Sequence, residues 1–488
     1  MSVDETSPLV ASVNPLRRRT NNLLVLVVAL VVLGLCLTRD PQVRPATVHL
    51  DVSDVFCDAA AQASGYIQLP KKTDDHYFYW FFASRDQPNT DPLILWLTGG
   101  PGASSLLALL TENGPCVVGA DANSTTSNPY SWTNNASVLW VDQPTGTGFS
   151  YGAPGDFDRT EDDVGANMYA FLQRWLQANP TYIGRPFFIT GESYSGQYIP
   201  VIASTILDRQ ATVNNATQRN DDDDVMINLQ GIALGNAIVS QQVQFQHQLD
   251  LFYENAYNLT LLNASSLASY EHNLASFIQW TAQCSQLQNV TACHELTSES
   301  VRAILLGPIV LEAKVNPYDM RQPSILTPDG GIPDDILATP TTDNVKRFLN
   351  QPHVRARLGL SDASPSWAIT SPDVSRHLRF DATRDYEAIV ASLLHRHVRV
   401  LVYAGDADLI CNWRGCEAWT LHMRWAGQNV FASAIERPFA LANEVKGAVR
   451  SAQNLTFLRV FNSGHMVPSN QPEATLTMIQ RFVRNEPL

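Results

Sequence analysis

The residues around Ser193 have the types and spacing expected of a catalytic nucleophile. This serine follows the apolar run 187–190 and precedes a stretch compatible with a helix, with the small residues Gly191 and Ser195 two positions to either side. A serine between a strand and a helix in this setting is typical of a nucleophile elbow, whose strained and crowded backbone tolerates only small neighbours. Because such a match often arises by chance, the interpretation depends on partner residues elsewhere in the chain.

The partners of such a serine are expected later in the sequence, each in a loop that follows a strand. Asp408 lies just beyond the apolar run 398–403, and His465 lies just beyond the run 456–460. Asp406 stands two residues before Asp408 and could be the acid instead. This order predicts a triad in which the histidine takes the serine's proton and returns it to the leaving group, while the acid fixes the imidazole tautomer.

The oxyanion of the tetrahedral intermediate needs backbone N–H donors. Tyr194, the residue after the serine, is expected to supply one of them. The second is expected from Gly100, in the glycine-rich loop 99–102 that follows the apolar run 93–97. Because glycine has no side chain, the backbone of this loop can approach the reacting carbonyl closely.

These loops need a scaffold, and six short apolar runs predict its buried strands. The runs are 93–97, 138–141, 187–190, 229–234, 398–403 and 456–460. A helix is predicted between the second and the third run, with Thr160 as its N-cap and apolar residues on one face. Strand, helix and strand in this order predict an α/β fold with a mostly parallel central sheet and helices on both faces.

The pattern changes between residues 240 and 342, where helical segments rich in Gln, Asn and Ser replace the apolar runs. We interpret residues 240–342 as a helical cap inserted into the fold. Residues 50–239 and 343–488 are then the two parts of the core.

The N-terminal residues predict export. A polar tail, residues 1–22, ends in a basic cluster and precedes an apolar run within residues 23–38. This run is shorter than the ~20 residues that usually span a bilayer, which favours a cleaved signal peptide, whereas the long tail before it favours a signal anchor. An anchor would make the chain a single-pass type II membrane protein. The expected destination is the secretory pathway, ending in a vacuole, a lysosome or the extracellular space.

Cysteines and glycosylation motifs fit an oxidising lumen. Six cysteines remain when Cys36 is set aside; Cys284 and Cys293 are the first expected disulfide, and Cys411 is expected to be a buried free thiol. Seven Asn-x-Ser/Thr motifs without an intervening proline are candidate glycosylation sites: Asn123, Asn135, Asn215, Asn258, Asn263, Asn289 and Asn454.

The composition indicates which classes of partner the protein can bind. A net charge of -14 argues against binding to nucleic acid, whose phosphates are held by clustered Lys and Arg. A hydrophobic fraction of 45% fits a globular enzyme. The triad chemistry requires neither a metal nor a cofactor, and the sequence makes no prediction of oligomeric state.

Six longer motifs, in order along the chain, resemble the serine carboxypeptidase family. They are WLTGGPGASS at 96–105, ENGP at 112–115, DQPTGTGFSY at 142–151, GESYSG at 191–196, GDADLICNW at 405–413 and GHMVP at 464–468. The resemblance covers residues 51–488. It implies an α/β-hydrolase fold with a helical cap, and it implies Asp408 rather than Asp406 as the acid of the triad.

Members of this family recognise the substrate's terminal carboxylate with two neighbouring carboxyl groups, and the resemblance implies Glu112 and Glu192 for this role. An Asn-Gly pair assists in the family, and Thr98 and Gly99 stand at its positions here. Two carboxyl groups in contact cannot both ionise without a large electrostatic cost, so one is expected to keep a proton near neutral pH and donate a hydrogen bond to the substrate carboxylate. This predicts the highest activity in mild acid.

Three departures from the family pattern matter. Thr98 replaces an asparagine and can donate one hydrogen bond, but with a shorter reach, which leaves selectivity for a terminal carboxylate open. Ala103 stands where many members have a cysteine of a long-range disulfide, so the bridging must differ, and Cys416 is a candidate to take part. Cys411 matches a family thiol near the active site and is expected to be a pocket wall rather than a second nucleophile.

The predicted function is therefore a serine-type carboxypeptidase acting on the C-termini of peptides and proteins. A carboxypeptidase-like acyltransferase, which passes the acyl group to an alcohol, is the alternative with the same triad. A non-catalytic protective partner is the alternative from a different class, and the intact triad argues against it.

Overall fold

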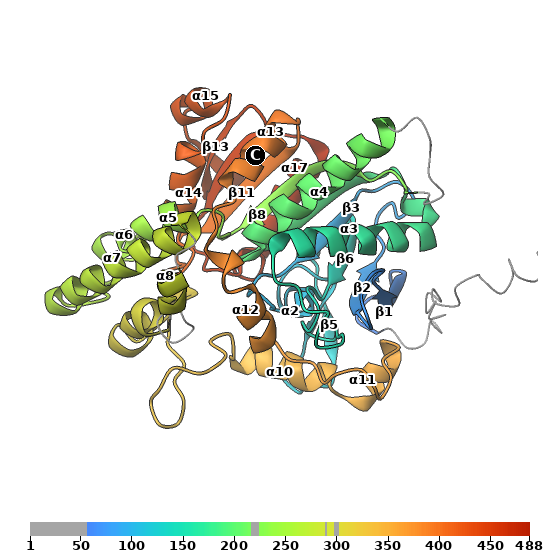
Figure 1. Cartoon of the computed structure of the whole chain (residues 1–488), viewed down its shortest axis with the longest axis horizontal. Helices are drawn as coiled ribbons and strands as arrows, with labels where there is room; N and C mark the ends of the chain where they lie inside the picture. The colour runs from blue at the N-terminus through green and yellow to red at the C-terminus, as the bar shows by residue number, and fades with distance from the viewer. Residues whose placement is uncertain (1–55, 216–223, 288–289, 297–301) are drawn as a thin grey trace, which may run out of the picture. The chain divides into compact units, whose positions relative to one another are not determined.

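The computed structural model of the chain describes residues 56–215, 224–287, 290–296 and 302–488, which belong to one compact unit. Parallel strands run side by side through the middle of its sheet (Figure 1). In spatial order they are β6 (Ser137–Val141), β3 (Leu93–Leu97), β7 (Pro186–Glu192), β8 (Asn228–Gly235), β11 (Arg399–Gly405) and β14 (Leu455–Val460). Each predicted apolar run is one of these strands, so the prediction of a parallel core is confirmed.

Antiparallel strands that the apolar runs did not predict extend the sheet at both edges. The complete sheet has ten strands, and the four at its edges are β1 (Gln62–Gln68), β2 (His76–Phe82), β12 (Arg437–Leu441) and β13 (Glu444–Ala452). β2 pairs with β6, and β13 pairs with β14. Separate pairs are formed by β4 (Cys116–Val118) with β5 (Thr125–Ser127) and by β9 (Val315–Asn316) with β10 (Asp319–Pro323).

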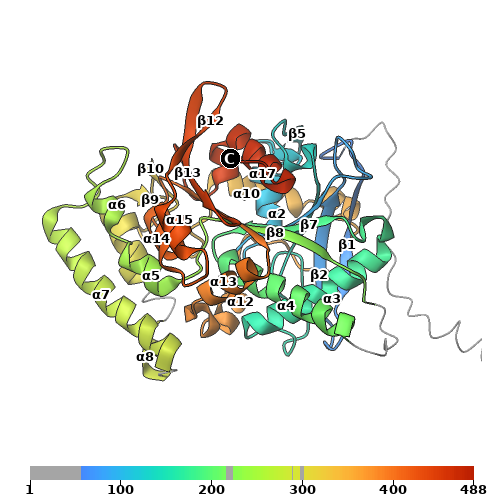
Figure 2. The ribbon, with the colours of Figure 1, turned by 90° about the horizontal axis from the view of Figure 1, so that it is seen from above.

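Helices cover both faces of the sheet, as the α/β-hydrolase prediction requires (Figure 2). On one face lie α3 (Glu161–Ala178), α4 (Ser195–Asn215) and α13 (Glu387–His395). On the other face lie α2 (Ser105–Thr111) and α17 (Pro472–Arg484).

The two faces explain why the central strands are continuously apolar. In β3, Leu93, Leu95 and Leu97 belong to the core layer under α3 and α4, whereas Ile94 and Trp96 belong to the layer under α2 and α17. Because successive side chains of a strand point to opposite faces, a strand covered on both faces needs apolar residues at every position.

Helix α3 begins where the sequence predicts. The Thr160 hydroxyl accepts a hydrogen bond from the backbone N–H of Asp163, and the Asp163 carboxylate accepts one from the backbone N–H of Thr160. This reciprocal capping satisfies N–H groups that the first helical turn leaves unpaired.

Most remaining helices lie between β8 and β11 in sequence. Figure 1 shows α5, α6, α7 and α8 gathered beside the C-terminal part of the sheet, in the stretch predicted to be the cap. The helices of this part of the chain are α5 (Gln241–Gln246), α6 (Asp250–Tyr253), α7 (Ala264–Leu287), α8 (Val290–Glu295), α10 (Pro340–Leu349), α11 (Pro352–Arg357) and α12 (Pro372–Leu378). Later in the chain come α14 (Trp413–His422), α15 (Gln428–Ser433) and α16 (Val467–Asn470).

The described residues form two disulfides. Cys284 pairs with Cys293, as predicted, and Cys57 pairs with Cys116. The expectation that Cys416 takes part in a bridge is wrong, because its thiol is buried and free and donates instead to backbone carbonyl oxygens.

The two disulfides are expected to differ in their contribution to stability. Cys57→Ala/Cys116→Ala should lower the free energy of unfolding by about 4 kcal/mol, because this bridge joins residues 59 positions apart. Cys284→Ala/Cys293→Ala should lower it by only about 3 kcal/mol, because its separation is 9. Urea denaturation of both double variants without reductant measures the order, and a larger loss for the 284–293 pair would contradict it.

The predicted polar tail, residues 1–22, and the apolar run, residues 23–38, lie outside the described residues, as does Asn289. Within the described ranges, no helix is long and apolar enough to span a bilayer. Of the other glycosylation candidates, Asn215 is at the end of α4 and Asn135 is half-buried. The exposed ones are Asn123, Asn258, Asn263 and Asn454.

Candidate active site

Ser193 lies at the turn between the end of β7 and the start of α4. Its φ is +64°, a left-handed conformation that a residue with a side chain adopts only when its surroundings enforce it. The Ser193 N–H donates to the carbonyl of Gly235 at 3.0 Å, and the Ser193 carbonyl accepts from the N–H of Ile238 at 2.9 Å. The serine is half-exposed while its neighbours are buried, so the predicted elbow is present.

His465 and Asp408 form the predicted pair. The histidine follows β14 and the aspartate follows β11, two parallel neighbours whose C-terminal ends meet at one edge of the sheet. His465 Nδ1 lies 2.6 Å from Asp408 Oδ2, and both side chains are buried. Asp406, the alternative acid, instead accepts a hydrogen bond from the Tyr257 hydroxyl.

Cys411 connects this pair to the serine. Its thiol contacts the Ser193 hydroxyl, and its sulfur lies within 4.8 Å of ligand atoms of both His465 and Asp408. Ser193, His465 and Asp408 therefore all lie around the Cys411 sulfur. Burial and the nearby Asp408 charge raise the pKa of Cys411 well above its usual range, which keeps the thiol protonated and supports its prediction as a pocket wall.

The pKa of His465 reflects two opposed effects. Burial disfavours the imidazolium, but the charge and hydrogen bond of Asp408, with a smaller contribution from Glu192, outweigh it and raise the pKa above its ordinary value. With Nδ1 facing Asp408, the ring's Nε2 is available to a serine proton.

The predicted oxyanion loop lies directly against the elbow. A Cβ at Gly99 would lie 2.3 Å from the backbone nitrogen of Tyr194, so only glycine allows this approach. Gly100 has a φ of +110°, which also favours glycine. Among the described residues, the backbone N–H groups of Gly100 and Tyr194 have no hydrogen-bond partner, so both are free to donate to an oxyanion.

Glu112 and Glu192 lie in contact, as the family resemblance implies. Glu192 is the last residue of β7, and Glu112 directly follows helix α2; each residue is 3% exposed. No N–H or hydroxyl of the described residues donates to the Glu112 carboxyl. Burial raises the pKa of Glu112 to about 8, and burial together with the Glu112 charge raises that of Glu192 well above its usual range. The pair therefore retains a proton through neutral pH.

Thr98 is buried at the end of β3, close to this region of the sheet. Its hydroxyl oxygen accepts a hydrogen bond from Trp96 Nε1 at 3.0 Å, and its backbone N–H donates to Ser105 Oγ at 3.1 Å. The Thr98 O–H hydrogen is therefore still available for one hydrogen bond, as predicted.

Two residues that bind Asp408 and His465 were not predicted. Asn236, directly after β8, donates from Nδ2 to Asp408 Oδ2 at 2.8 Å and accepts from the Gly405 N–H at 3.0 Å. The Tyr318 carbonyl accepts from the His465 N–H at 2.8 Å, and its ring lies 4.7 Å from the imidazole. Asn236 could have been found from its position just after a predicted strand, whereas Tyr318 lies in the turn between β9 and β10, which the sequence did not predict.

Asn236→Ala is expected to lower kcat without unfolding the protein. The substitution removes a hydrogen bond to a buried carboxylate, which is worth about 1.5–3 kcal/mol. If all of this energy is lost from the transition state, kcat falls by roughly ten- to a hundredfold. Asn236→Asp should be worse, because it places a second acid 2.8 Å from Asp408. Steady-state kinetics measures both, and an unchanged kcat in either variant would contradict this positioning role.

Comparison with known proteins agrees with this geometry. The pattern that describes the serine carboxypeptidases matches residues 56–485. Carboxypeptidase Y homolog A of Coccidioides posadasii is 36% identical over 90% of this chain and 77% of its own length. This chain belongs to the serine carboxypeptidase family. It is therefore a peptide hydrolase of the serine type.

Other relatives of this serine carboxypeptidase support the same placement. Serine carboxypeptidase-like 48 of Arabidopsis thaliana is 34% identical over 87% of this chain and 78% of its own length. Among solved structures, KEX1(delta)p, a prohormone-processing carboxypeptidase from Saccharomyces cerevisiae, has a TM-score of 0.73 and 24% identity, covering 90% of this chain and 94% of its own. That likeness supports the fold, including its mostly parallel sheet with helices on both faces.

Proposed function

We propose that Ser193, His465 and Asp408 are the catalytic triad of this carboxypeptidase and that Glu112 and Glu192 select substrates with a free C-terminal carboxylate. The observation that carries the proposal is a buried carboxyl pair with raised pKa values beside the triad. Burying two acids without partners is unfavourable for folding, and such groups are concentrated at functional sites. An esterase would need only the triad and the oxyanion donors.

In the proposed reaction, His465 Nε2 takes the proton of Ser193 while the serine oxygen attacks the scissile carbonyl carbon. The N–H groups of Tyr194 and Gly100 bind the resulting oxyanion. The imidazolium, held by Asp408, gives its proton to the leaving amine, which departs as the free C-terminal amino acid. Water then repeats the sequence on the acyl-enzyme and releases the shortened peptide.

The proposed carboxylate site uses hydrogen bonds rather than a fixed cation. A protonated carboxyl of the Glu112–Glu192 pair donates to the substrate's terminal carboxylate. The Thr98 hydroxyl and the Gly99 N–H are proposed as further donors, from the loop that also supplies Gly100. An uncharged carboxylic acid can donate to a carboxylate, whereas an ionised one repels it.

Relative rates on a blocked dipeptide and on its C-terminal amide test this proposal. The free acid should have the higher kcat/KM, and Glu112→Gln should reduce that preference. Equal values for the two substrates in the wild type would overturn it. Assay with acyl-glucose esters and an alcohol acceptor checks for the acyltransferase alternative, and a fluorophosphonate probe that labels the wild type but not Ser193→Ala excludes a non-catalytic protein.

We propose further that the enzyme works in the lumen of the secretory pathway, with residues 240–342 as its cap. Its two disulfides and four exposed glycosylation candidates support an oxidising compartment. N-terminal sequencing of the mature protein distinguishes a cleaved signal from an anchor, because a start after Cys36 means cleavage. A smaller apparent mass after glycosidase treatment would support occupied sites.

A further inference from the structure

The position of Glu112 depends on its backbone. Among the described residues, no N–H or hydroxyl donates a hydrogen bond to its carboxyl, whose side-chain hydrogen bond is with the other acid, Glu192. Helix α2 ends at Thr111, and the φ and ψ of Glu112, -129° and -85°, are not helical. The N–H groups of Glu112 and Asn113 still donate to the Ala108 carbonyl, but among the described residues no hydrogen bond from the helix reaches residues 114–116. Whatever holds the loop of residues 112–116 therefore determines where this carboxyl lies.

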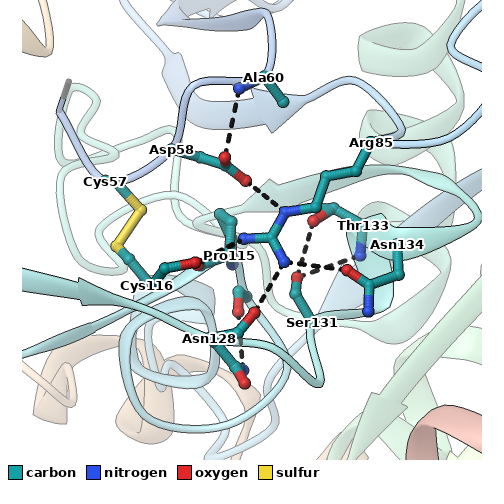
Figure 3. Close-up of polar contacts among 12 residues, drawn as sticks. Cys57, Asp58, Ala60, Arg85, Pro115, Cys116, Asn128, Ser131, Thr133 and Asn134 are labelled. Carbon is teal, nitrogen blue, oxygen red and sulfur yellow. Dashed lines mark hydrogen bonds and ion pairs between the residues drawn. A yellow bond between two sulfur atoms is a disulfide. The ribbon is translucent and has the colours of Figure 1, made fainter.

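Arg85 holds that loop from outside the active site (Figure 3). Its Nη2 donates to the Pro115 carbonyl at 2.9 Å, and its Nη1 donates to the Asn128 carbonyl at 2.7 Å and to Asn134 Oδ1 at 2.9 Å. Its backbone N–H donates to the Thr133 carbonyl at 2.7 Å. The planar guanidinium thus joins three chain segments that a single-point donor such as lysine could not span.

Asn128 continues the connection to Glu112. Its Nδ2 donates to the Glu112 carbonyl at 3.2 Å and to the Gly114 carbonyl at 2.9 Å, and its backbone N–H donates to the Pro115 carbonyl at 2.8 Å. The side chain is buried. Arg85 is therefore connected to the backbone of Glu112 through Asn128, and it also binds the loop itself at the Pro115 carbonyl.

The guanidinium is itself anchored. Asp58 Oδ2 accepts from Arg85 Nε at 2.8 Å, and the two side chains are 11% and 21% exposed. Asp58 is next to Cys57, whose disulfide to Cys116 ends the same loop, as Figure 3 shows. The disulfide thus joins the C-terminal end of the loop, at Cys116, to the segment that precedes β1, and the ion pair joins Arg85 to the same segment.

We propose that Arg85 is a positioning residue for specificity, which holds Glu112 against Glu192 and so sets the enzyme's preference for a free C-terminal carboxylate. This inference rests on the proposed role of Glu112. Among the described residues, no hydrogen bond of Arg85 reaches the triad or the oxyanion loop. Its loss should therefore affect the binding of the terminal carboxylate and leave the chemical step in place.

The test is a double-mutant cycle of Arg85→Met and Glu112→Gln, read as the ratio of kcat/KM for a blocked dipeptide to that for its amide. Arg85→Met should lower this ratio by roughly ten- to a hundredfold, the scale of an ångström's misplacement, mainly by raising KM for the free acid. In the Glu112→Gln background, Arg85→Met should not lower the ratio further, because coupled residues are not additive.

Arg185→Met is the matched control. Arg185 also donates to backbone carbonyls, those of Thr181, Pro88 and Asp91, and none of these hydrogen bonds reaches residues 112–116. It should change thermal stability without changing the substrate ratio. Arg85→Lys keeps a charge for Asp58 and should give an intermediate ratio, which supplies a folded variant if Arg85→Met is unstable.

The outcomes are distinct. If Glu112→Gln lowers the ratio but neither Arg85 variant does, Arg85 is only structural and the inference is wrong. If the losses of Arg85→Met and Glu112→Gln add, Arg85 does not act through Glu112 and the inference is equally wrong. If Glu112→Gln itself leaves the ratio unchanged, the proposed carboxylate site fails, and with it the basis for a role of Arg85.

Discussion

Replacement of Ser193 by alanine is expected to lower kcat for peptide hydrolysis by about 10⁶-fold, the loss expected when a triad nucleophile is removed. The turn at Ser193 has a left-handed φ and hydrogen bonds made by the backbone, which alanine retains. The neighbouring Cys411 does not replace the serine, because its raised pKa keeps the thiol protonated. Kinetics of the purified variant, with urea denaturation as the folding control, measure the loss.

The other triad residues should behave as parts of one unit. Asp408→Asn should lower kcat by roughly 10⁴-fold, through the wrong imidazole tautomer. Adding His465→Ala to Ser193→Ala should cause little further loss, because the two act in the same step. Multiplicative losses, or a Ser193→Ala enzyme that retains wild-type activity, would contradict the mechanism.

Hydrolysis of free-acid substrates is expected to fall as the pH rises through about 8, whereas hydrolysis of the matching amide should persist. Burial raises the pKa of Glu112 to about 8, so below this pH the Glu112–Glu192 pair holds the proton that the substrate carboxylate requires. Once that proton is lost, two like charges about 4 Å apart repel by roughly 4 kcal/mol at an effective dielectric of about 20, or about a thousandfold in affinity.

The acid limit of the same profile belongs to His465, which must be neutral to act as a base. Because its folded pKa is raised, activity should be lost at a higher pH than for an unperturbed histidine, equally for the acid and the amide. With both pKa values raised, the pH optimum is expected to lie above the mild-acid optimum predicted from the sequence. Profiles of kcat/KM for both substrates, in the wild type and in Glu112→Gln, measure this; alkaline limbs that coincide in the wild type would refute the shared proton.

The parallel core could be predicted because strands buried on both faces are apolar at every position. For example, strand β3 begins and ends at the same residues as the predicted apolar run 93–97. The edge strands could not be found this way: β2 is a run of aromatic residues without a clear period, and β13 mixes exposed and buried positions. Their place depends on pairing with β6 and β14, which is non-local.

The common location of Ser193, Asp408 and His465 could likewise be predicted, because each directly follows a predicted strand and the C-terminal ends of parallel strands share one edge. The contact between Glu112 and Glu192 required the family resemblance. The Arg85 contacts could not be predicted, since Asp58, Pro115 and Asn128 come from separate segments and are joined mainly through backbone carbonyls, which any sequence carries.

This protein is expected to remove residues from free C-termini by way of Ser193. Incubation of the purified protein with a peptide mixture in H₂¹⁸O, read by mass spectrometry, is the test. We expect products shortened one residue at a time from the C-terminus, each with ¹⁸O in its new carboxylate, and none with Ser193→Ala. Internal cleavage, products without the label, or the same products from Ser193→Ala would contradict it.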